Sequence, residues 1–296
     1  MINIIDKECP MCKSEISDLK ISSEIDPIKN KDLLEKNWRG FYKDKLFFSY
    51  HRCSCGLLYN KNFFDNSSLR KLYSSMDDNI HGDIFSDNLT RDYYIKVIKD
   101  LKIMPNSKIL EIGADNGSFS KKLYKAFIPS KIDVVEPNTK MEIFLKSIAN
   151  KHYKDIHEIS NNEEYDLIVA IHVLDHLADL KDFMNKINNL LKEDGNLIII
   201  VHNELSLLSK ILGKRWPAYC LQHPHLFNKS SLTDLMKNFN LCEIKIQDTV
   251  NYFKFGYLLR HFFLALFKID IKFPGMFTVG LKLGNIIGIY NKKKKD

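Results

Sequence analysis

The chain has 296 residues, enough for one α/β domain of about 200 residues and a small additional lobe. Its 45 % apolar and 27 % charged residues exclude a disordered chain and are typical of a globular protein. The net charge is +7, but the four lysines and one aspartate of Lys292–Asp296 supply +3 of it. The remaining +4 is too small to argue for a nucleic-acid partner, and we interpret the lysine run as a solvated tail.

Secretion and membrane-spanning signals are absent from the sequence. The N-terminal residues lack the basic start and apolar core of a secretory signal, and no apolar run reaches the roughly 18–20 residues of a membrane span. The nearest candidate, Tyr257–Phe267, is interrupted by Arg260 and His261. It predicts either a buried helix or one that lies flat on a membrane surface. We therefore expect a cytoplasmic protein, with peripheral membrane contact left open.

Residues 1–60 hold two close pairs of cysteines and no long helical period. Cys9 and Cys12 form a Cys-Pro-Met-Cys knuckle, and Cys53 and Cys55 follow about forty residues later. Such pairs suit metal ligation in a reducing compartment better than disulfides. They predict a zinc-ribbon-like lobe in which a tetrahedral Cys₄ site holds structural zinc. His51 is an alternative ligand, and four free thiols in a packed lobe are the metal-free alternative.

Residues 61–105 predict a helical bridge between this lobe and a larger domain. Apolar residues recur at helical spacing over Ser67–Met76 and Thr90–Lys102. Pro105 ends the second segment and precedes a strand, so we place the larger domain at 106–296.

From residue 108 onward, short apolar segments alternate with amphipathic ones. Strands are predicted at Ile109–Ile112, Ile132–Val135, Asp155–Ile159, Tyr165–Val173, Asn196–Val201, Leu241–Gln247 and Asn285–Tyr290. Helices are predicted at Ser118–Phe127, Thr139–Ile148, Leu180–Leu191 and Ser230–Asn238, the last opened by a serine cap. This alternation predicts an α/β fold in which helices cover both faces of a parallel sheet.

The segment Lys108–Gly117, KILEIGADNG, combines a strand, a glycine turn and the start of a helix. Glycines in such a turn let the backbone approach a ligand at the helix N-terminus, as in dinucleotide-binding folds. However, the turn lacks the full G-x-G-x-x-G spacing that holds a pyrophosphate. Glu111 would be unusual inside a dinucleotide-binding strand, and Glu136 ends the next strand, where a carboxylate can bind both hydroxyls of a ribose.

These segments resemble the motifs of class I S-adenosylmethionine (SAM)-dependent methyltransferases. ILEIGADNGSFS resembles motif I, VVEPN resembles the acidic ribose-binding motif, and YDLIVAIHVLDHLAD…LLKEDGNLIIIVHN resembles DxIxxxxVLEHxxD…LLKxGGxLxIxxPN. The resemblance covers about 105–250 and 280–292. It implies a Rossmann-like, mostly parallel sheet whose last strand is antiparallel. It also implies that the cofactor is SAM and that these residues surround it: Glu111, Gly113, Asp115, Gly117, Glu136 (at the ribose), Ile171 and His172.

Two further features indicate which group of methyltransferases the chain resembles. Asp115 stands where the family usually has a second glycine, a replacement also seen in the loops of sugar C-methyltransferases. A CPxC…CxxCGL lobe ahead of the domain resembles bacterial enzymes that methylate nucleotide-linked sugars or other surface-glycan precursors, although Cys53-x-Cys55 is one residue short of that pattern. Both features imply a small saccharide acceptor.

Three histidines are candidates for the base that removes the acceptor's proton. Methyl transfer requires an aligned acceptor, and a hydroxyl acceptor benefits from a base with a pKa near 6.5. His176 follows the predicted strand Tyr165–Val173, and His223 and His225 lie in WPAYCLQHPHLF. The carboxyl ends of parallel strands face the ligand crevice, which favours all three, while a structural role remains the alternative for each.

An aromatic, leucine-rich segment at about 251–282 interrupts the last two strands. It predicts a hydrophobic helical insertion that roofs the acceptor site or forms a dimer face, and the oligomeric state stays open.

Two other functions compete with sugar methylation. Some RNA base methyltransferases also carry a zinc-binding lobe, but here the basic residues outside the tail are scattered rather than clustered with aromatic residues. A non-catalytic SAM-binding or interaction protein is the other alternative.

Overall fold

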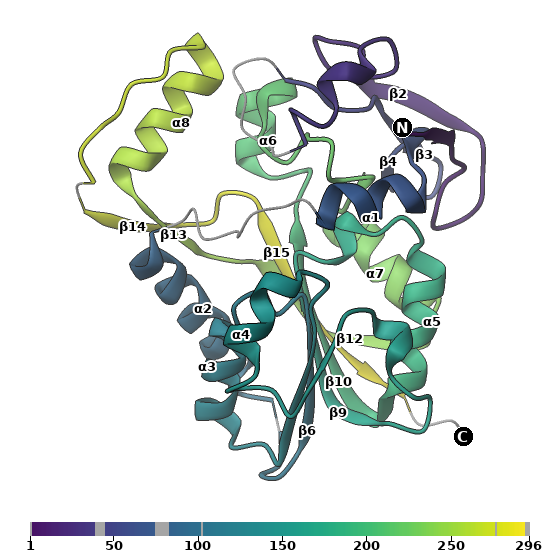
Figure 1. Ribbon diagram of the computed structural model, residues 1–296, viewed down its shortest axis with the longest axis vertical. Coiled ribbons are helices and arrows are strands. Elements are labelled where there is room, and N and C mark those ends of the chain that lie inside the picture. The colour runs from purple at the N-terminus through teal and green to yellow at the C-terminus, as the bar shows by residue number, and fades with distance from the viewer. Residues whose placement is uncertain (1, 39–44, 75–82, 102, 276, 294–296) are drawn as a thin grey trace.

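A computed structural model describes residues 2–38, 45–74, 83–101, 103–275 and 277–293 (Figure 1). Its centre is a seven-stranded sheet in the order β12-β15-β10-β9-β6-β7-β8. All neighbouring pairs are parallel except those of β15, which is antiparallel to both β10 and β12. The strands are β6 (Lys108–Ile112), β7 (Lys131–Val135), β8 (Lys151–Tyr153), β9 (Tyr165–Ile171), β10 (Leu191–His202), β12 (Leu241–Asp248) and β15 (Asn285–Lys292). The predicted mostly parallel sheet with an antiparallel last strand is confirmed.

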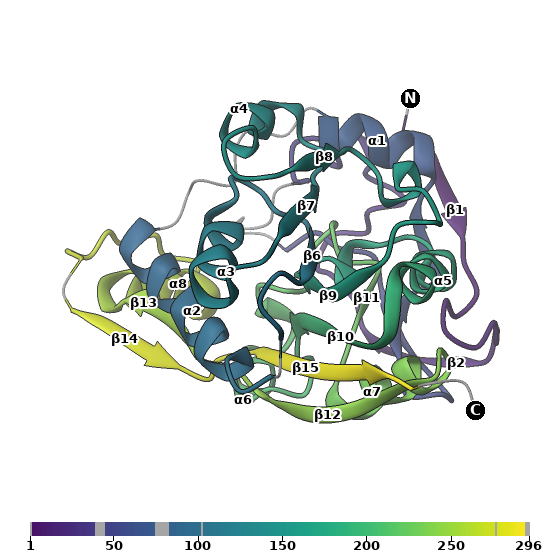
Figure 2. The same cartoon turned by 90° about the horizontal axis from the view of Figure 1, so that it is seen from below.

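Central strands form here because their apolar side chains are buried on both faces of the sheet. On β9, Ile168 and Ala170 enter one core, whereas Leu167 and Val169 enter the other, as the two-residue repeat of a strand requires. The helices α2 (Ile84–Ile98), α3 (Ser118–Phe127) and α4 (Glu142–Leu145) cover one face, and α5 (Leu180–Leu190) and α7 (Lys229–Lys237) cover the other (Figures 1 and 2).

Two local predictions were wrong. The predicted strand Asp155–Ile159 is a 3₁₀ turn over Ile156–Glu158, because the Asp155 carboxylate accepts the His157 N–H and caps it. The third strand is β8 instead, an edge strand too polar to be recognised. Helix α7 is capped by Asn228 rather than by serine, and Asn228 and Ser231 form a reciprocal capping box.

The N-terminal lobe shares its sheet with the larger domain. Strands β2 (Ser17–Ile21), β3 (Tyr50–Cys53) and β4 (Leu58–Asn60) are extended by β11 (His225–Leu226), which pairs with β4. Strand β1 (Ile4–Asp6) pairs with β5 (Asn62–Phe64), so the strand pairing of the lobe extends past residue 60. A bidentate ion pair between Arg52 and the buried Glu204 joins the lobe to the segment after β10.

The bridge contains α1 (Asn66–Ser74) and α2, which begins before the predicted Thr90 because Asp83 caps it. Met76 and Lys102, the predicted ends of these two helices, lie outside the described residues.

The aromatic segment near the C-terminus is an arm that projects from the body (Figures 1 and 2). It consists of α8 (Phe255–Phe267) between the paired strands β13 (Asn251–Lys254) and β14 (Thr278–Leu281), so one helix and a ribbon stand where helices alone were predicted. A short helix, α6 (Leu207–Leu212), follows β10. Among the described residues, no helix is both long and apolar enough to cross a membrane.

Candidate cofactor and acceptor site

The turn between β6 and α3 depends on its two glycines. Gly113 and Gly117 both have φ +73°, a conformation that strains other residues. A Cβ on Gly113 would lie 2.8 Å from Cγ2 of Val173, and one on Gly117 would lie 2.6 Å from Cδ1 of Ile148. The Gly113 N–H donates to the Val135 carbonyl at 2.8 Å. The turn is therefore packed against the end of β7, the segment after α4 and the loop after β9, and it has no room for side chains at these two positions.

Glu136 connects this turn to the end of β7. One carboxylate oxygen accepts the N–H of Asp115 at 2.8 Å, and the other accepts the N–H of Asn138 at 2.9 Å. Burial raises the pKa of Glu136, and the two N–H bonds oppose that rise. The carboxylate is thus fixed at the carboxyl edge of the sheet, beside the glycine turn.

Glu111 lies inside the protein, beneath the turn. Its side chain is 1 % exposed and accepts a hydrogen bond from the Ser120 hydroxyl at the start of α3. Burial raises the pKa of Glu111 to about 7, although the Ser120 bond lowers it. This carboxyl therefore joins β6 to α3.

The end of β9 lies against the same turn. The carbonyl of Ile171 lies 3.8 Å from the Cβ position of Gly113. The next residue, His172, has φ +52°, and its N–H donates to the carbonyl of Ile200 on β10 at 2.8 Å. The backbone N–H of His172 therefore bonds to β10. The strained backbone conformation of His172 turns the chain out of β9.

Four histidines gather around one buried aspartate beyond the ends of β9 and β10. The ring centroids of His172 and His202 are 4.5 Å apart, those of His202 and His223 are 4.8 Å apart, and those of His223 and His176 are 4.5 Å apart. Asp175 is fully buried among them. We call these five residues the histidine cluster.

Asp175 anchors the histidine cluster to β10. One of its oxygens accepts the backbone N–H of His202 at 3.2 Å and the Nδ1–H of the same ring at 2.5 Å. Burial alone would raise the pKa of Asp175, but the neighbouring His202 and His172 outweigh it and hold that pKa well below its usual range. Burial lowers the pKa of His202 to about 4, so this imidazole is neutral near pH 7.

The three predicted bases do not lie together. His176 and His223 face each other with 3.3 Å between their Nε2 atoms, and the Tyr73 hydroxyl lies 3.3 Å from Nδ1 of His176. His225 is fully buried in β11, where its Nε2–H donates to the Leu174 carbonyl at 2.6 Å. This hydrogen bond joins β11 to the segment after β9, so His225 has a structural role. His176 and His223 belong to the histidine cluster.

The pKa values of the two facing histidines move in opposite directions. Burial lowers the pKa of His176 to about 3. Burial also lowers the pKa of His223, but Cys220, with Sγ 3.4 Å from its Nδ1, outweighs it and raises that pKa to about 9. At neutral pH His176 is therefore neutral and His223 is protonated, so His223 can donate its Nε2–H to Nε2 of His176.

Sequence reasoning assigned no role in this site to His202, Asp175 or Cys220. One signal for His202 was present, because it stands where the family pattern xxPN has proline. Tyr73 lies about one hundred residues from His176 in sequence, and no spacing connects them.

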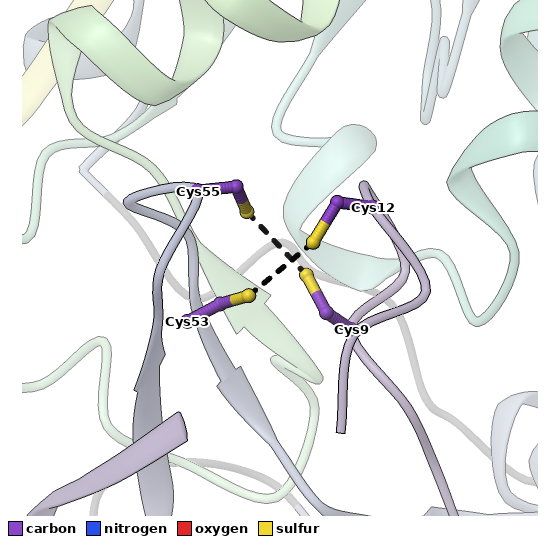
Figure 3. A group of neighbouring side chains, drawn as sticks. All are labelled: Cys9, Cys12, Cys53 and Cys55. Carbon is purple, nitrogen blue, oxygen red and sulfur yellow. Dashed lines mark hydrogen bonds between the residues drawn. The ribbon is translucent and has the colours of Figure 1, made fainter. Parts of the chain in front are cut away.

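The four N-terminal cysteines meet in one group (Figure 3). Sγ of Cys9 lies 3.6 Å from that of Cys55, and Sγ of Cys12 lies 3.4 Å from that of Cys53; all four sulfurs lie within 4.8 Å of one another. A tetrahedral zinc site with Zn–S bonds of about 2.3 Å separates its sulfurs by ~3.8 Å. The donor set and its spacing therefore fit a zinc ion.

The comparisons with known proteins agree with this architecture. A family model described as "Methyltransferase domain" matches residues 60–244, more than half of the chain. The chain belongs to this methyltransferase family. Its sheet is that of the class I, SAM-dependent methyltransferase fold, as the sequence resemblance implied. No curated protein matches the sequence.

Two solved structures resemble the fold of this methyltransferase at low sequence identity. One is a chain of the complex between the Haloferax volcanii Trm112 methyltransferase activator and a putative methyltransferase, with a TM-score of 0.53 and 9 % identity over 71 % of this chain and 93 % of that one. The other is a putative S-adenosylmethionine-dependent methyltransferase from Listeria monocytogenes, with a TM-score of 0.50 and 10 % identity over 70 % of this chain and 99 % of that one. These likenesses concern the fold alone.

Proposed function

We propose that this methyltransferase transfers the methyl group of SAM to a hydroxyl of a small saccharide acceptor, such as a sugar, a nucleotide-sugar or a surface-glycan precursor. One observation carries the proposal: the glycine turn, Glu136 and the histidine cluster all lie at the carboxyl edge of the same parallel sheet. Ligands bind at this edge in open α/β folds. In this proposal the turn supplies the cofactor side and the cluster the acceptor side of one site at that edge.

On the cofactor side, Glu136 is suited to hold the ribose. Each of its oxygens accepts one backbone N–H, which fixes the carboxylate, and each keeps a further lone pair for a ribose hydroxyl. The methionine part of SAM would lie beside the turn and the Ile171–His172 segment, whose Ile171 carbonyl is 3.8 Å from the Cβ position of Gly113. Glu111 would support this site from below, and Asp115 would line it.

On the acceptor side, the imidazoles suit a hydroxyl better than an apolar group. His176 is the base we favour because it is neutral at pH 7, whereas His223 is already protonated. Burial makes His176 a weak base in the ligand-free protein, and an acceptor would have to replace the contact between the two Nε2 atoms to reach it. His225 is the weakest of the three predicted bases because its Nε2–H is used by Leu174. Asp115 in the cofactor loop, through its resemblance to sugar C-methyltransferases, supports a saccharide.

The test uses SAM labelled in its methyl group. Incubation of the protein with labelled SAM and fractionated cell extract should label a saccharide, identified by mass spectrometry, and Gly113→Val should abolish the label. Label in RNA would contradict the acceptor class, and label in no fraction would contradict catalysis on a small acceptor.

We also propose that Cys9, Cys12, Cys53 and Cys55 hold a structural zinc ion. The sulfur spacing supports it, and zinc would stabilise a lobe whose longest strands are short. Metal analysis of the reduced, folded protein should give about one zinc per chain. Cys53→Ser should lose it and Cys242→Ser, a cysteine outside the group, should not; a zinc content near zero in wild type would contradict the proposal.

Helix α8 exposes aromatic side chains, and we propose that it contacts a membrane surface. Such contact would bring the protein to a lipid-linked acceptor. Tyr257, Phe262 and Phe267 of this helix are 42 %, 44 % and 57 % exposed. Sedimentation with anionic phospholipid vesicles should carry down the wild-type protein, whereas Phe262→Glu should stay in the supernatant. Equal sedimentation of both would contradict the contact.

A further inference from the structure

We infer that His172, Asp175 and His202 bind a divalent transition-metal ion at the carboxyl edge of the sheet, at a site separate from the four cysteines. The three residues come from the ends of β9 and β10, whereas the cysteines belong to the N-terminal lobe. The sequence motifs described above assign no metal to this position.

The donor atoms of these three residues already lie close together. One nitrogen of each histidine and one carboxylate oxygen all lie within 4.8 Å of one another. The oxygen of Asp175 is 2.5 Å from Nδ1 of His202 and 3.8 Å from Nδ1 of His172. A metal with bonds of about 2.0–2.2 Å to nitrogen and oxygen holds such atoms ~3.3 Å apart. Small side-chain rotations would therefore complete the set.

Two buried atoms in this group lack a partner. Asp175 is fully buried, yet its Oδ1 accepts no hydrogen bond from any described residue, and Nδ1 of His172 is also buried without a hydrogen bond in the described part of the chain. Buried polar atoms are nearly always satisfied by protein, water or an ion. A cation bound by Oδ2 of Asp175 and the imidazoles would give Nδ1 of His172 a partner, and bidentate binding by the carboxylate would also satisfy Oδ1.

The donor set selects the class of metal. Two imidazoles and one carboxylate suit Zn²⁺, Fe²⁺, Co²⁺ or Ni²⁺, whereas Mg²⁺ and Ca²⁺ prefer oxygen ligands. The Nδ1–H of the neutral His202 ring now donates to Asp175, so metal binding at this nitrogen requires the other tautomer, with the proton on Nε2.

Asn285 contacts the His172 ring on the side away from Asp175. The amide nitrogen of Asn285 lies 3.3 Å from Nε2 of His172 and 3.2 Å from the side-chain oxygen of Asn251. This contact orients the His172 ring so that Nδ1 faces Asp175. Metal binding at Nδ1 puts the ring proton on Nε2, so the Asn285 amide would have to turn its oxygen toward that proton, as the acceptors beside metal-binding histidines do.

The position suggests what the metal would do. Three protein ligands leave coordination positions open, as in catalytic rather than structural sites. An acceptor hydroxyl bound there would lose its proton more readily, and the glycine turn lies next to Ile171, the residue before His172. This role rests on the proposed function, whereas metal binding itself does not.

Cobalt binding by the full-length protein tests the inference without acceptor or SAM. The cysteine site is first filled with one equivalent of zinc per chain, unbound zinc is removed, and Co²⁺ is then titrated while calorimetry and visible absorption are recorded. We expect one Co²⁺ per chain with the weak absorption of cobalt on nitrogen and oxygen. Cobalt on cysteine would instead show strong thiolate-to-metal absorption, so failure of the zinc proposal is recognised separately.

Matched variants decide which residues bind the cobalt. His172→Ala and His202→Ala change half-buried side chains, and each should weaken Co²⁺ binding by about 100-fold or more, since loss of outer partners alone costs 10–100-fold. His157→Ala, a half-exposed histidine elsewhere, should bind Co²⁺ like wild type. Absence of Co²⁺ binding up to ~1 mM in zinc-filled wild type, or unchanged binding in His202→Ala, would overturn the inference.

Discussion

The glycine turn after β6 and the histidine cluster after β9 face the same edge of the sheet but are held in different ways. The turn is fixed by backbone hydrogen bonds and by the absence of side chains at Gly113 and Gly117. The cluster is fixed by side chains, with imidazoles packed around the buried carboxylate of Asp175. The turn should therefore respond to added volume, whereas the cluster should respond to lost charge or lost hydrogen bonds.

The largest effect is expected for added volume in the turn. Gly113→Val places a branched side chain at φ +73° and 2.8 Å from Val173, so it should abolish SAM binding measured by calorimetry. The control is Gly213→Ala, which also has positive φ but no atom within 4 Å of its Cβ position, and which should bind SAM normally. Wild-type affinity in Gly113→Val would show that the turn does not bind the cofactor.

The next effect is expected in the free energy of unfolding, which should depend on pH through Glu111, the carboxyl beneath the turn. The folded-state pKa of Glu111, about 7, lies above its ordinary value of 4.5, so the folded protein binds this proton more tightly than the unfolded chain. The resulting stabilisation is complete below pH 4.5 and is lost as the pH rises to 7, by about 3 kcal/mol. Glu111→Gln should remove this loss from the free energy of unfolding, measured in urea between pH 4.5 and 8. Parallel pH profiles for both proteins would contradict the buried carboxyl.

A slightly smaller effect is expected for the carboxylate that connects the turn to β7. Glu136→Ala should weaken SAM binding by about 100-fold, because charged hydrogen bonds contribute roughly 1.5–3 kcal/mol each. Glu136→Gln keeps the shape and one acceptor oxygen, and its affinity should fall between those of wild type and Glu136→Ala. Calorimetry of the three proteins checks this order, and equal affinities would remove Glu136 from the site.

The smallest effect separates His225 from the histidine cluster. His225→Leu leaves the Leu174 carbonyl without its donor and should lower the free energy of unfolding by about 1–3 kcal/mol, with SAM affinity unchanged. His225→Gln can restore a donor near the position of Nε2 and should recover part of the stability. A loss of SAM binding with unchanged stability would instead place His225 at the ligand.

The difference between the glycine turn and the histidine cluster also explains which parts of the site could be predicted from the sequence. The turn, α3 and β9 were predictable because contiguous residues carry their signals: paired glycines, helical periodicity and a long apolar run. Strand β8 was missed because an edge strand of polar residues has no apolar alternation. The histidine cluster could not be predicted, since only the parallel pairing of β9 with β10 brings His202 beside Asp175, and only the packing of α1 brings Tyr73 to His176.

A crystal structure of the protein with S-adenosylhomocysteine, the product of methyl transfer, tests the central claim most directly. We predict that the ribose hydroxyls lie within hydrogen-bonding distance of Glu136, with the sulfur between the glycine turn and His172 and facing the histidine cluster. A nucleoside bound elsewhere, or no bound nucleoside at a saturating concentration, would contradict the assignment of this edge of the sheet as the site of methyl transfer.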